Sequence, residues 1–283
     1  MTFIVVAGLF GLLLGSFLNV AAHRLPQMAA SGVAPRGKSG WFLAWPGSYC
    51  PHCQTPVPPY YNVPLAGFLL LRGRAKCCGK PIGACYPLIE AGGALVAAAA
   101  AWRFGWGADF LLAVIFLSTL LLIAVMDMRR YYILDILTLP LLWLGLLANV
   151  DARFALLPDA VVGAAGGYVA MRLIAAAGGA VFRKTAMGGG DCKLMAAMGA
   201  WLGWQALPML LFLASLAGIG YALSSAFARR TARLAAARAA GRTAVRTVFK
   251  SRFCFGPALS FAGALMLFWG DEMLAAYWRF ILR

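Results

Sequence analysis

The sequence predicts an all-α protein that crosses a membrane about eight times. Of its 283 residues, 63% are hydrophobic and only 12% are charged, and the mean hydropathy is +0.80. Soluble domains usually carry about 25% charged and 45–50% apolar residues, so this composition indicates a lipid-facing chain. The net charge of +16 would also fit a nucleic-acid-binding protein. However, the basic residues lie between long apolar runs, as membrane topology requires, and we expect no nucleic-acid partner.

Eight apolar segments are candidates for the helices that cross the bilayer. A helix needs roughly 17–25 apolar residues to do so, and most of the segments approach this length. The segment 191–204 is shorter, and it would cross where the bilayer is thin or where other helices bury it. The first segment lacks the basic start and the cleavage site of a signal peptide, so we expect it to be retained. The segments are 2–22, 86–103, 108–126, 136–150, 157–180, 191–204, 205–227 and 255–276.

The orientation follows from the positions of lysine and arginine, which concentrate on the cytoplasmic side of membrane proteins. Eight spans place every basic stretch on one side, whereas omitting 191–204 would move the most basic stretch, 228–254, to the other. We therefore expect an outside N-terminus and three parts. These are a first membrane helix at 1–22, a cytoplasmic loop domain at 23–85, and a membrane core at 86–283. The cytoplasmic stretch 228–254 is expected to contact anionic lipid headgroups.

Five of the seven cysteines lie in the predicted cytoplasmic loop, at Cys50, Cys53, Cys77, Cys78 and Cys85. The cytosol is reducing, so clustered cysteines there are more typical of a metal site than of disulfides. The two remaining cysteines, Cys192 and Cys254, stand alone, and we expect them to be packing residues.

Four of the nine acidic residues fall on the predicted cytoplasmic side, and two of these border apolar helices. Asp127 ends one such helix, and Asp191 begins another after three consecutive glycines. A carboxylate at membrane depth costs about 2.5–3.5 kcal/mol on insertion scales, so each is a functional candidate.

Two carboxylates that converge in an apolar site do not both ionise easily, so one keeps a proton. The ionised partner then takes a proton from water while the protonated one polarises a peptide carbonyl, as in aspartic proteases. Glycines before Asp191 would let its backbone approach a substrate or another helix closely. The competing hypothesis is structural: Asp191 caps its helix, and Asp127 pairs with Arg129 or Arg130.

The chain resembles the type IV prepilin peptidases, membrane aspartyl proteases that remove leaders from type IV prepilins and type II secretion pseudopilins. The resemblance covers almost the whole chain. Its motifs are Gly15-Ser16-Phe17-Leu18-Asn19-Val20, Arg24-Leu25-Pro26, Tyr86-Pro87-Leu88-Ile89-Glu90, Asp127, the segment 137–146, Met187-Gly188-Gly189-Gly190-Asp191, Lys193-Leu194, Gly199-Ala200-Trp201-Leu202-Gly203 and Phe255-Gly256-Pro257.

The resemblance implies an enzyme of the bacterial inner membrane whose active site lies near the cytoplasmic face. Its catalytic aspartates fall on Asp127 and Asp191. It implies cleavage after a glycine and methylation of the new N-terminus with S-adenosylmethionine, for which the sequence assigns no residues. The chain has Arg129 where the family often has a further aspartate, and it has Leu134-Asp135 where the family commonly has Pro-Asp. We expect Asp135 and Glu90 to be structural.

The cytoplasmic loop resembles the tetracysteine zinc site of the same family, which has two Cys-x-x-Cys pairs. Cys50 and Cys53 form the first pair, but Ala75 replaces the first cysteine of the second. The predicted ligands are therefore Cys50, Cys53, Cys77 and Cys78, with Cys77 joining only if the backbone bends sharply. His52 and Cys85 are less natural substitutes, and a metal-free reduced loop is the alternative.

Two other functions compete with a peptidase that is also a methyltransferase. One is a peptidase that lacks methyltransferase activity, since the altered cysteine loop bears on that second reaction. The other belongs to a different class, a membrane transporter that uses interfacial carboxylates. Transporters tend to show inverted repeats and interrupted helices near the bilayer centre, and no such duplication stands out here.

Overall fold

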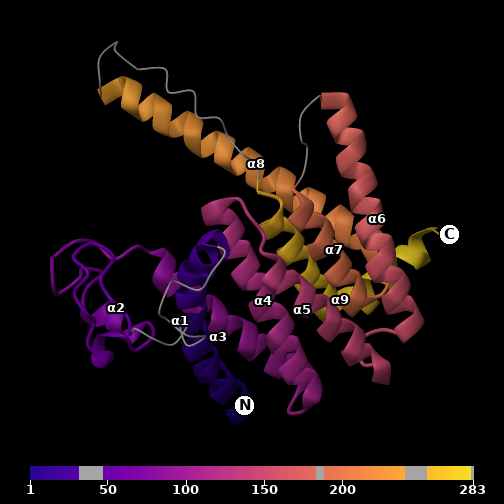
Figure 1. Ribbon diagram of the computed structural model, residues 1–283, viewed down its shortest axis with the longest axis horizontal. Coiled ribbons are helices and arrows are strands. Elements are labelled where there is room, and N and C mark those ends of the chain that lie inside the picture. Colours follow the sequence, from indigo (N-terminus) through magenta and orange to yellow (C-terminus); the bar gives the residue numbers. More distant parts are fainter. Residues whose placement is uncertain (32–46, 183–187, 240–253, 282–283) are drawn as a thin grey trace. The chain divides into compact units, whose positions relative to one another are not determined.

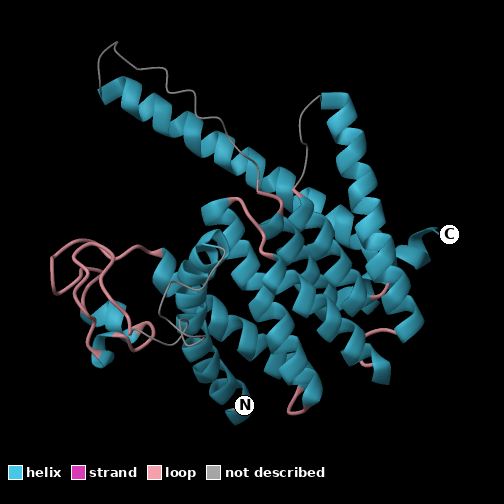
Figure 2. Cartoon of the chain, viewed as in Figure 1, coloured by secondary structure: helices cyan, strands magenta, loops and turns pink. Residues whose placement is uncertain are grey.

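The computed structural model describes residues 1–31, 47–182, 188–239 and 254–281. Within these ranges the chain is helical and contains no β-strand beyond two isolated bridges (Figure 2). This confirms the predicted all-α class. The helices (Figure 1) are α1 Thr2–Ser31, η2 Pro59–Tyr61, α2 Ala66–Leu70, α3 Cys85–Phe104, α4 Ala108–Arg130, α5 Asp135–Ala148, η3 Asn149–Asp151, α6 Leu157–Phe182, α7 Gly189–Leu202, α8 Ala206–Ala239 and α9 Gly256–Ile281.

Every predicted membrane segment contains a helix, and six of the helices in the described ranges are long and apolar enough to cross a membrane. These six are α1, α3, α4, α6, α8 and α9, and they make the chain a multi-pass membrane protein. The helices α5 and α7 have 14 residues each. At 1.5 Å per residue each is about 21 Å long, which is shorter than the roughly 30 Å hydrocarbon core. Whether α5 and α7 cross the membrane stays a prediction.

Two helices continue beyond the segments predicted for them. The helix α1 extends past residue 22 to Ser31, and α8 extends past residue 227 to Ala239. The bilayer limits the apolar length of a helix but not the helix itself, so the helices continue through residues 23–31 and 228–239, beyond their predicted membrane spans. The rest of the basic stretch, 240–253, and residues 32–46 of the cytoplasmic loop lie outside the described residues, as does Met187.

The chain forms two compact units, Met1–Val125 and Met126–Arg283. In the first unit α1 packs along α3 through glycines, as Figure 1 shows. A Cβ atom on Gly15 would lie 2.6 Å from the Cα of Glu90, and Gly11 meets the backbone of Gly93 equally closely. Gly11 and Gly15 form a Gly-x-x-x-Gly pattern, which lets membrane helices approach at van der Waals distance.

The second unit is built around α7, most of which is buried. This helix packs against α5, α6 and α9, and its Gly199 meets the backbone of Gly163 on α6. The amide of Asn149 donates hydrogen bonds to the carbonyls of Ala200 (2.8 Å) and Trp201 (3.0 Å). Because these carbonyls at the helix end have no partner within the helix, Asn149 fixes the end of α7 opposite Asp191.

Candidate active site and candidate metal centre

Asp127 lies in the last turn of α4, and its side chain is buried, with 6% of its surface exposed. Its Oδ2 atom accepts a hydrogen bond of 3.0 Å from the backbone N–H of Gly256, the first residue of α9. A Cβ atom on Gly256 would lie 2.7 Å from the same oxygen. Any side chain at this position would therefore displace the carboxylate of Asp127. Gly256 was part of a motif in the sequence, but nothing in that motif indicated this role.

Asp191 is the third residue of α7, and it too is buried, at 9% exposure. Its carboxylate interacts with the backbone N–H of Gly188, which caps the helix N-terminus. A carboxylate that faces the N–H of the N-cap residue forms one half of a capping box, so this contact agrees with the structural role considered for Asp191. Of the glycines before it, Gly190 packs closely: a Cβ there would lie 2.7 Å from the Cβ of Ile133.

The two aspartates lie in the same buried region of the second unit. Their carboxylates interact electrostatically. The thiol of Cys254 interacts electrostatically with both aspartates. Burial is the main reason that the pKa of Cys254 is raised to about 11, and the charges of Asp127 and Asp191 add to it. A neutral buried thiol fits the packing role expected for this cysteine.

The ion pair considered for Asp127 is not seen in the described part of the chain, where Arg129 and Arg130 are exposed. Two buried, interacting carboxylates can share one proton, and that lets one act as a base and the other as an acid. The arrangement thus suits hydrolysis of a peptide bond by water.

The two other cytoplasmic-side acids hold elements together. Asp135 at the start of α5 forms a 2.6 Å ion pair with Lys193 of α7, and both side chains are partly exposed. In the first unit, the carboxylate of Glu90 accepts a hydrogen bond of 2.8 Å from the backbone N–H of Leu65 and so ties the loop to α3. These contacts agree with the structural roles expected for both.

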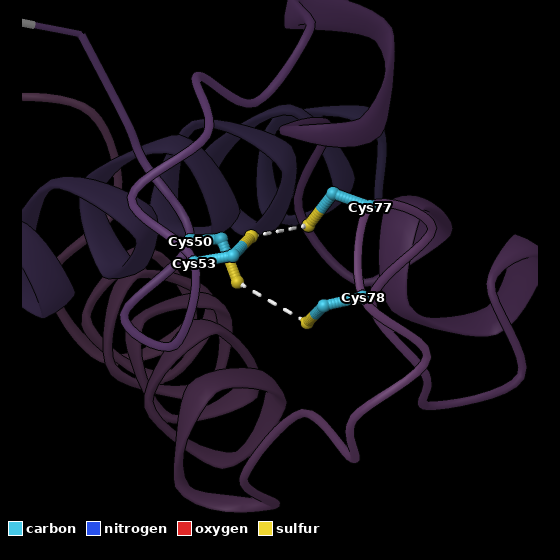
Figure 3. A group of neighbouring side chains, drawn as sticks. All are labelled: Cys50, Cys53, Cys77 and Cys78. Carbon is cyan, nitrogen blue, oxygen red and sulfur yellow. Dashed lines mark hydrogen bonds between the residues drawn. The ribbon is translucent and has the colours of Figure 1, made fainter.

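The cysteine cluster lies in the first unit, in the loop between α1 and α3 (Figure 3). The sulfur atoms of Cys50, Cys53, Cys77 and Cys78 all lie within 4.8 Å of one another. The Sγ atoms of Cys50 and Cys78 are 3.8 Å apart, and those of Cys53 and Cys77 are 3.2 Å apart. A tetrahedral zinc site with Zn–S bonds of about 2.3 Å has sulfur atoms about 3.8 Å apart. The four thiols therefore fit a zinc ion.

Two turns with the same hydrogen bonds hold these cysteines. In the first, the N–H of Cys50 bonds to the carbonyl of Thr55, and that of Gln54 bonds to the carbonyl of Cys50. In the second, the N–H of Ala75 bonds to the carbonyl of Lys80, and the N–H of Gly79 bonds to the carbonyl of Ala75. Gln54 and Gly79 both have positive φ angles, of 60° and 68°.

Ala75 thus occupies in the second turn the position that Cys50 holds in the first. Cys77 occupies the position of His52, and its sulfur lies within the cluster. Among the described residues, neither His52 nor Cys85 joins the group. The hydroxyl and the backbone N–H of Thr55 lower the pKa of Cys53 to about 6, which favours the thiolate that binds metals.

Two family models match this chain, one over the part that holds the cysteine cluster and one over the part that holds the aspartates. The Bacterial Peptidase A24 N-terminal domain matches residues 9–104, and the Type IV leader peptidase family matches residues 114–223. Curated relatives named prepilin leader peptidase/N-methyltransferase include the Pseudomonas aeruginosa protein, 37% identical over 99% of this chain and 95% of the relative. The Neisseria gonorrhoeae protein is 36% identical over 97% and 92%, and that of Klebsiella pneumoniae is 44% identical over 73% and 88%. No solved structure matches the chain significantly.

Proposed function

The chain belongs to the type IV leader peptidase family, and we propose that Asp127 and Asp191 are its catalytic pair. The enzyme removes the leaders of prepilins and pseudopilins and methylates the exposed N-terminus, with S-adenosylmethionine as methyl donor. The observation that carries the catalytic assignment is the burial of two interacting carboxylates that are contributed by different helices.

The proposed cleavage uses one proton shared by the pair. The ionised carboxylate takes a proton from water as the water oxygen attacks the carbonyl carbon of the scissile bond. The protonated carboxyl donates a hydrogen bond to the carbonyl oxygen, where negative charge develops. The leaving amine then takes a proton from the pair. Backbone N–H groups of Gly256 and Gly188 keep the two carboxylates oriented throughout.

The location of this reaction is part of the proposal. The placement of lysine and arginine supports an outside N-terminus in the inner membrane, with residues 23–85 and 228–254 in the cytoplasm and the latter near anionic lipid. Cleavage after the leader glycine would then occur near the cytoplasmic face. Labelling of single cysteines with an impermeant reagent tests this, because outside reactivity in either stretch would overturn the topology.

Zinc binding by Cys50, Cys53, Cys77 and Cys78 is also a proposal. Four thiolates without an open position are typical of structural zinc, which would hold the two turns together and take no part in hydrolysis. The fit of the four sulfur atoms to a tetrahedron supports it.

One experiment tests the two activities together. The purified chain is incubated with a prepilin, with and without S-adenosylmethionine, and the products are weighed by mass spectrometry. We expect loss of the leader in both samples and a gain of one methyl group only with the donor. Cleavage without a methyl gain would support the peptidase-only alternative. If the leader is retained in both samples, the peptidase function is wrong and the transporter hypothesis returns.

A further inference from the structure

The loop domain encloses a pocket that the proposed cleavage does not use. It lies within the unit Met1–Val125, between α1, the segment 47–84 and the start of α3, and has a volume of about 650 Å³. Pockets that bind small molecules measure about 300–1,000 Å³. The residues that matter to the argument are Asn19, Arg24, Tyr60, Tyr61, Lys76 and Glu90.

One wall of the pocket offers hydrogen-bond acceptors and a negative charge. Asn19 lines the pocket; its Nδ2 atom donates to the carbonyl of Tyr86 at 3.0 Å, and its Oδ1 atom is buried without a hydrogen-bond partner. Asn19 is buried, at 6% exposure. The carboxylate of Glu90, half-buried nearby, lines the same pocket.

Aromatic rings and cations also line the pocket. The rings of Tyr60 and Tyr61 contact each other, with centroids 4.4 Å apart. The ammonium of Lys76 donates to the Tyr61 hydroxyl at 2.8 Å and lies 5.2 Å from the ring centroid. The buried Arg24 lines the pocket as well. Aromatic faces suit a stacked purine, and cations suit a carboxylate.

We propose that this pocket binds S-adenosylmethionine, an inference that rests on the methyltransferase half of the proposed function. The adenine would stack on the tyrosine pair, and the donor's carboxylate would meet Lys76 and Arg24. Its sulfonium and ammonium groups would face the carboxylate of Glu90. When bound, the donor would supply a methyl group: the neutral N-terminal amine would form the new N–C bond, the electron pair of the C–S bond would go to sulfur, which would leave as the neutral thioether S-adenosylhomocysteine, and the amine nitrogen would lose a proton to water.

The same pocket adjoins the cysteine cluster, since Cys50 and Cys77 contribute to its lining. Any metal held by the four cysteines would therefore shape a wall of the donor pocket. The inference thus gives the cysteine loop a role in methylation.

Binding can be measured apart from activity, by equilibrium dialysis of radiolabelled S-adenosylmethionine against the full-length chain in lipid-supplemented detergent. Tyr61→Leu removes the aromatic face and should weaken binding about tenfold or more, whereas the matched Tyr61→Phe keeps the ring and should stay within about threefold. Glu90→Gln keeps an acceptor for Leu65 but loses the charge, and it should weaken binding about tenfold. Glu272→Gln, which removes an exposed charge from α9, should bind like the unmodified chain.

The outcomes separate this inference from the function on which it rests. If the unmodified chain methylates its product but Tyr61→Leu and Glu90→Gln bind the donor normally, the pocket assignment alone is wrong. If the unmodified chain neither binds the donor nor methylates, the methyltransferase function fails, and the pocket assignment fails with it. Leader cleavage reports whether each variant is folded. If Tyr61→Leu loses cleavage, it is not folded, and the binding of the donor by Glu90→Gln then tests the pocket assignment.

Discussion

The aspartate pair and the cysteine cluster are assembled in opposite ways. The aspartates are buried, lie 64 positions apart in the sequence, and are oriented by backbone groups at helix ends. Of the cysteines, Cys53 and Cys77 are exposed and Cys50 is buried, and all four lie on two short turns whose internal hydrogen bonds determine their geometry. The first site therefore depends on helix packing, and the second depends on local turn structure.

This difference determines how each site tolerates substitution. The turn at Ala75 lacks its expected cysteine, yet the adjacent Cys77 brings a sulfur into the cluster. The turn permits this substitution because the exposed side chain of Cys77 has room to reorient. The buried pair offers less freedom: a Cβ atom on Gly256 would lie 2.7 Å from the Asp127 oxygen, so one additional carbon atom would displace the carboxylate. Protein interiors are close-packed, so small changes there are felt.

The largest expected effect is loss of cleavage on changing either aspartate. Asp127→Asn and Asp191→Asn keep the side-chain size but cannot share a proton, so each should slow cleavage by at least about 10²–10⁴-fold. The double variant should be little worse, because residues that act as a unit are non-additive. Mass spectrometry of a prepilin measures the rate, and methylation of an already trimmed substrate should survive. Near-normal cleavage by either single variant would mean that the pair is misassigned.

A second prediction concerns Cys77, which supplies the sulfur that is missing at Ala75. Cys77→Ala should leave three ligands and reduce bound zinc to well below one per chain after mild chelation. The double variant Ala75→Cys, Cys77→Ala restores two regular Cys-x-x-Cys turns and should recover the metal. Elemental analysis of purified protein measures both. Full zinc retention by Cys77→Ala would contradict the four-cysteine site.

Metal removal sharpens the same comparison. A chelator that strips the cysteine cluster should weaken donor binding and methylation while leader cleavage persists, because the pocket and the cluster share the loop whereas the aspartates do not. Mass spectrometry before and after chelation separates the two activities. Equal loss of cleavage would show that the two sites are not independent.

A smaller effect is expected from crowding the oxygen of Asp127. In Gly256→Ala the new Cβ atom would lie 2.7 Å from that oxygen. This variant should lower kcat for cleavage about tenfold or more, with KM little changed. Gly270→Ala lies on the same helix, where the nearest neighbour is the flexible end of Met266 at 3.4 Å, and it should cleave at nearly the normal rate. Equal rates for the two variants would argue against a positioning role for Gly256.

The smallest effect is expected at Asp135. Its ion pair with Lys193 is partly exposed and screened by salt, so Asp135→Asn should change the cleavage rate by no more than about threefold. The same mass-spectrometric assay at low and high salt checks this, since the difference from the unmodified chain should shrink as salt rises. A loss as large as that of the aspartate variants would move Asp135 into the catalytic group.

The sequence by itself predicted the all-α membrane class, the positions of the helices, the family and the residues of both candidate sites. Hydropathy and short motifs are local properties, so they can be recognised without a fold. It did not predict where α1 and α8 end, because apolar length limits the membrane crossing and not the helix.

Only the tertiary structure decided which groups meet. The N–H of Gly256 donates to Asp127, although the two residues are 129 positions apart in the sequence. Only the fold shows that the amide of Asn19 bonds to Tyr86 and that its oxygen has no partner. Cys77 enters the cluster in place of the residue missing at Ala75 because two turns bring the sulfur atoms together. Such contacts depend on the packing of distant segments, and spacing along the chain carries no record of the distances between them.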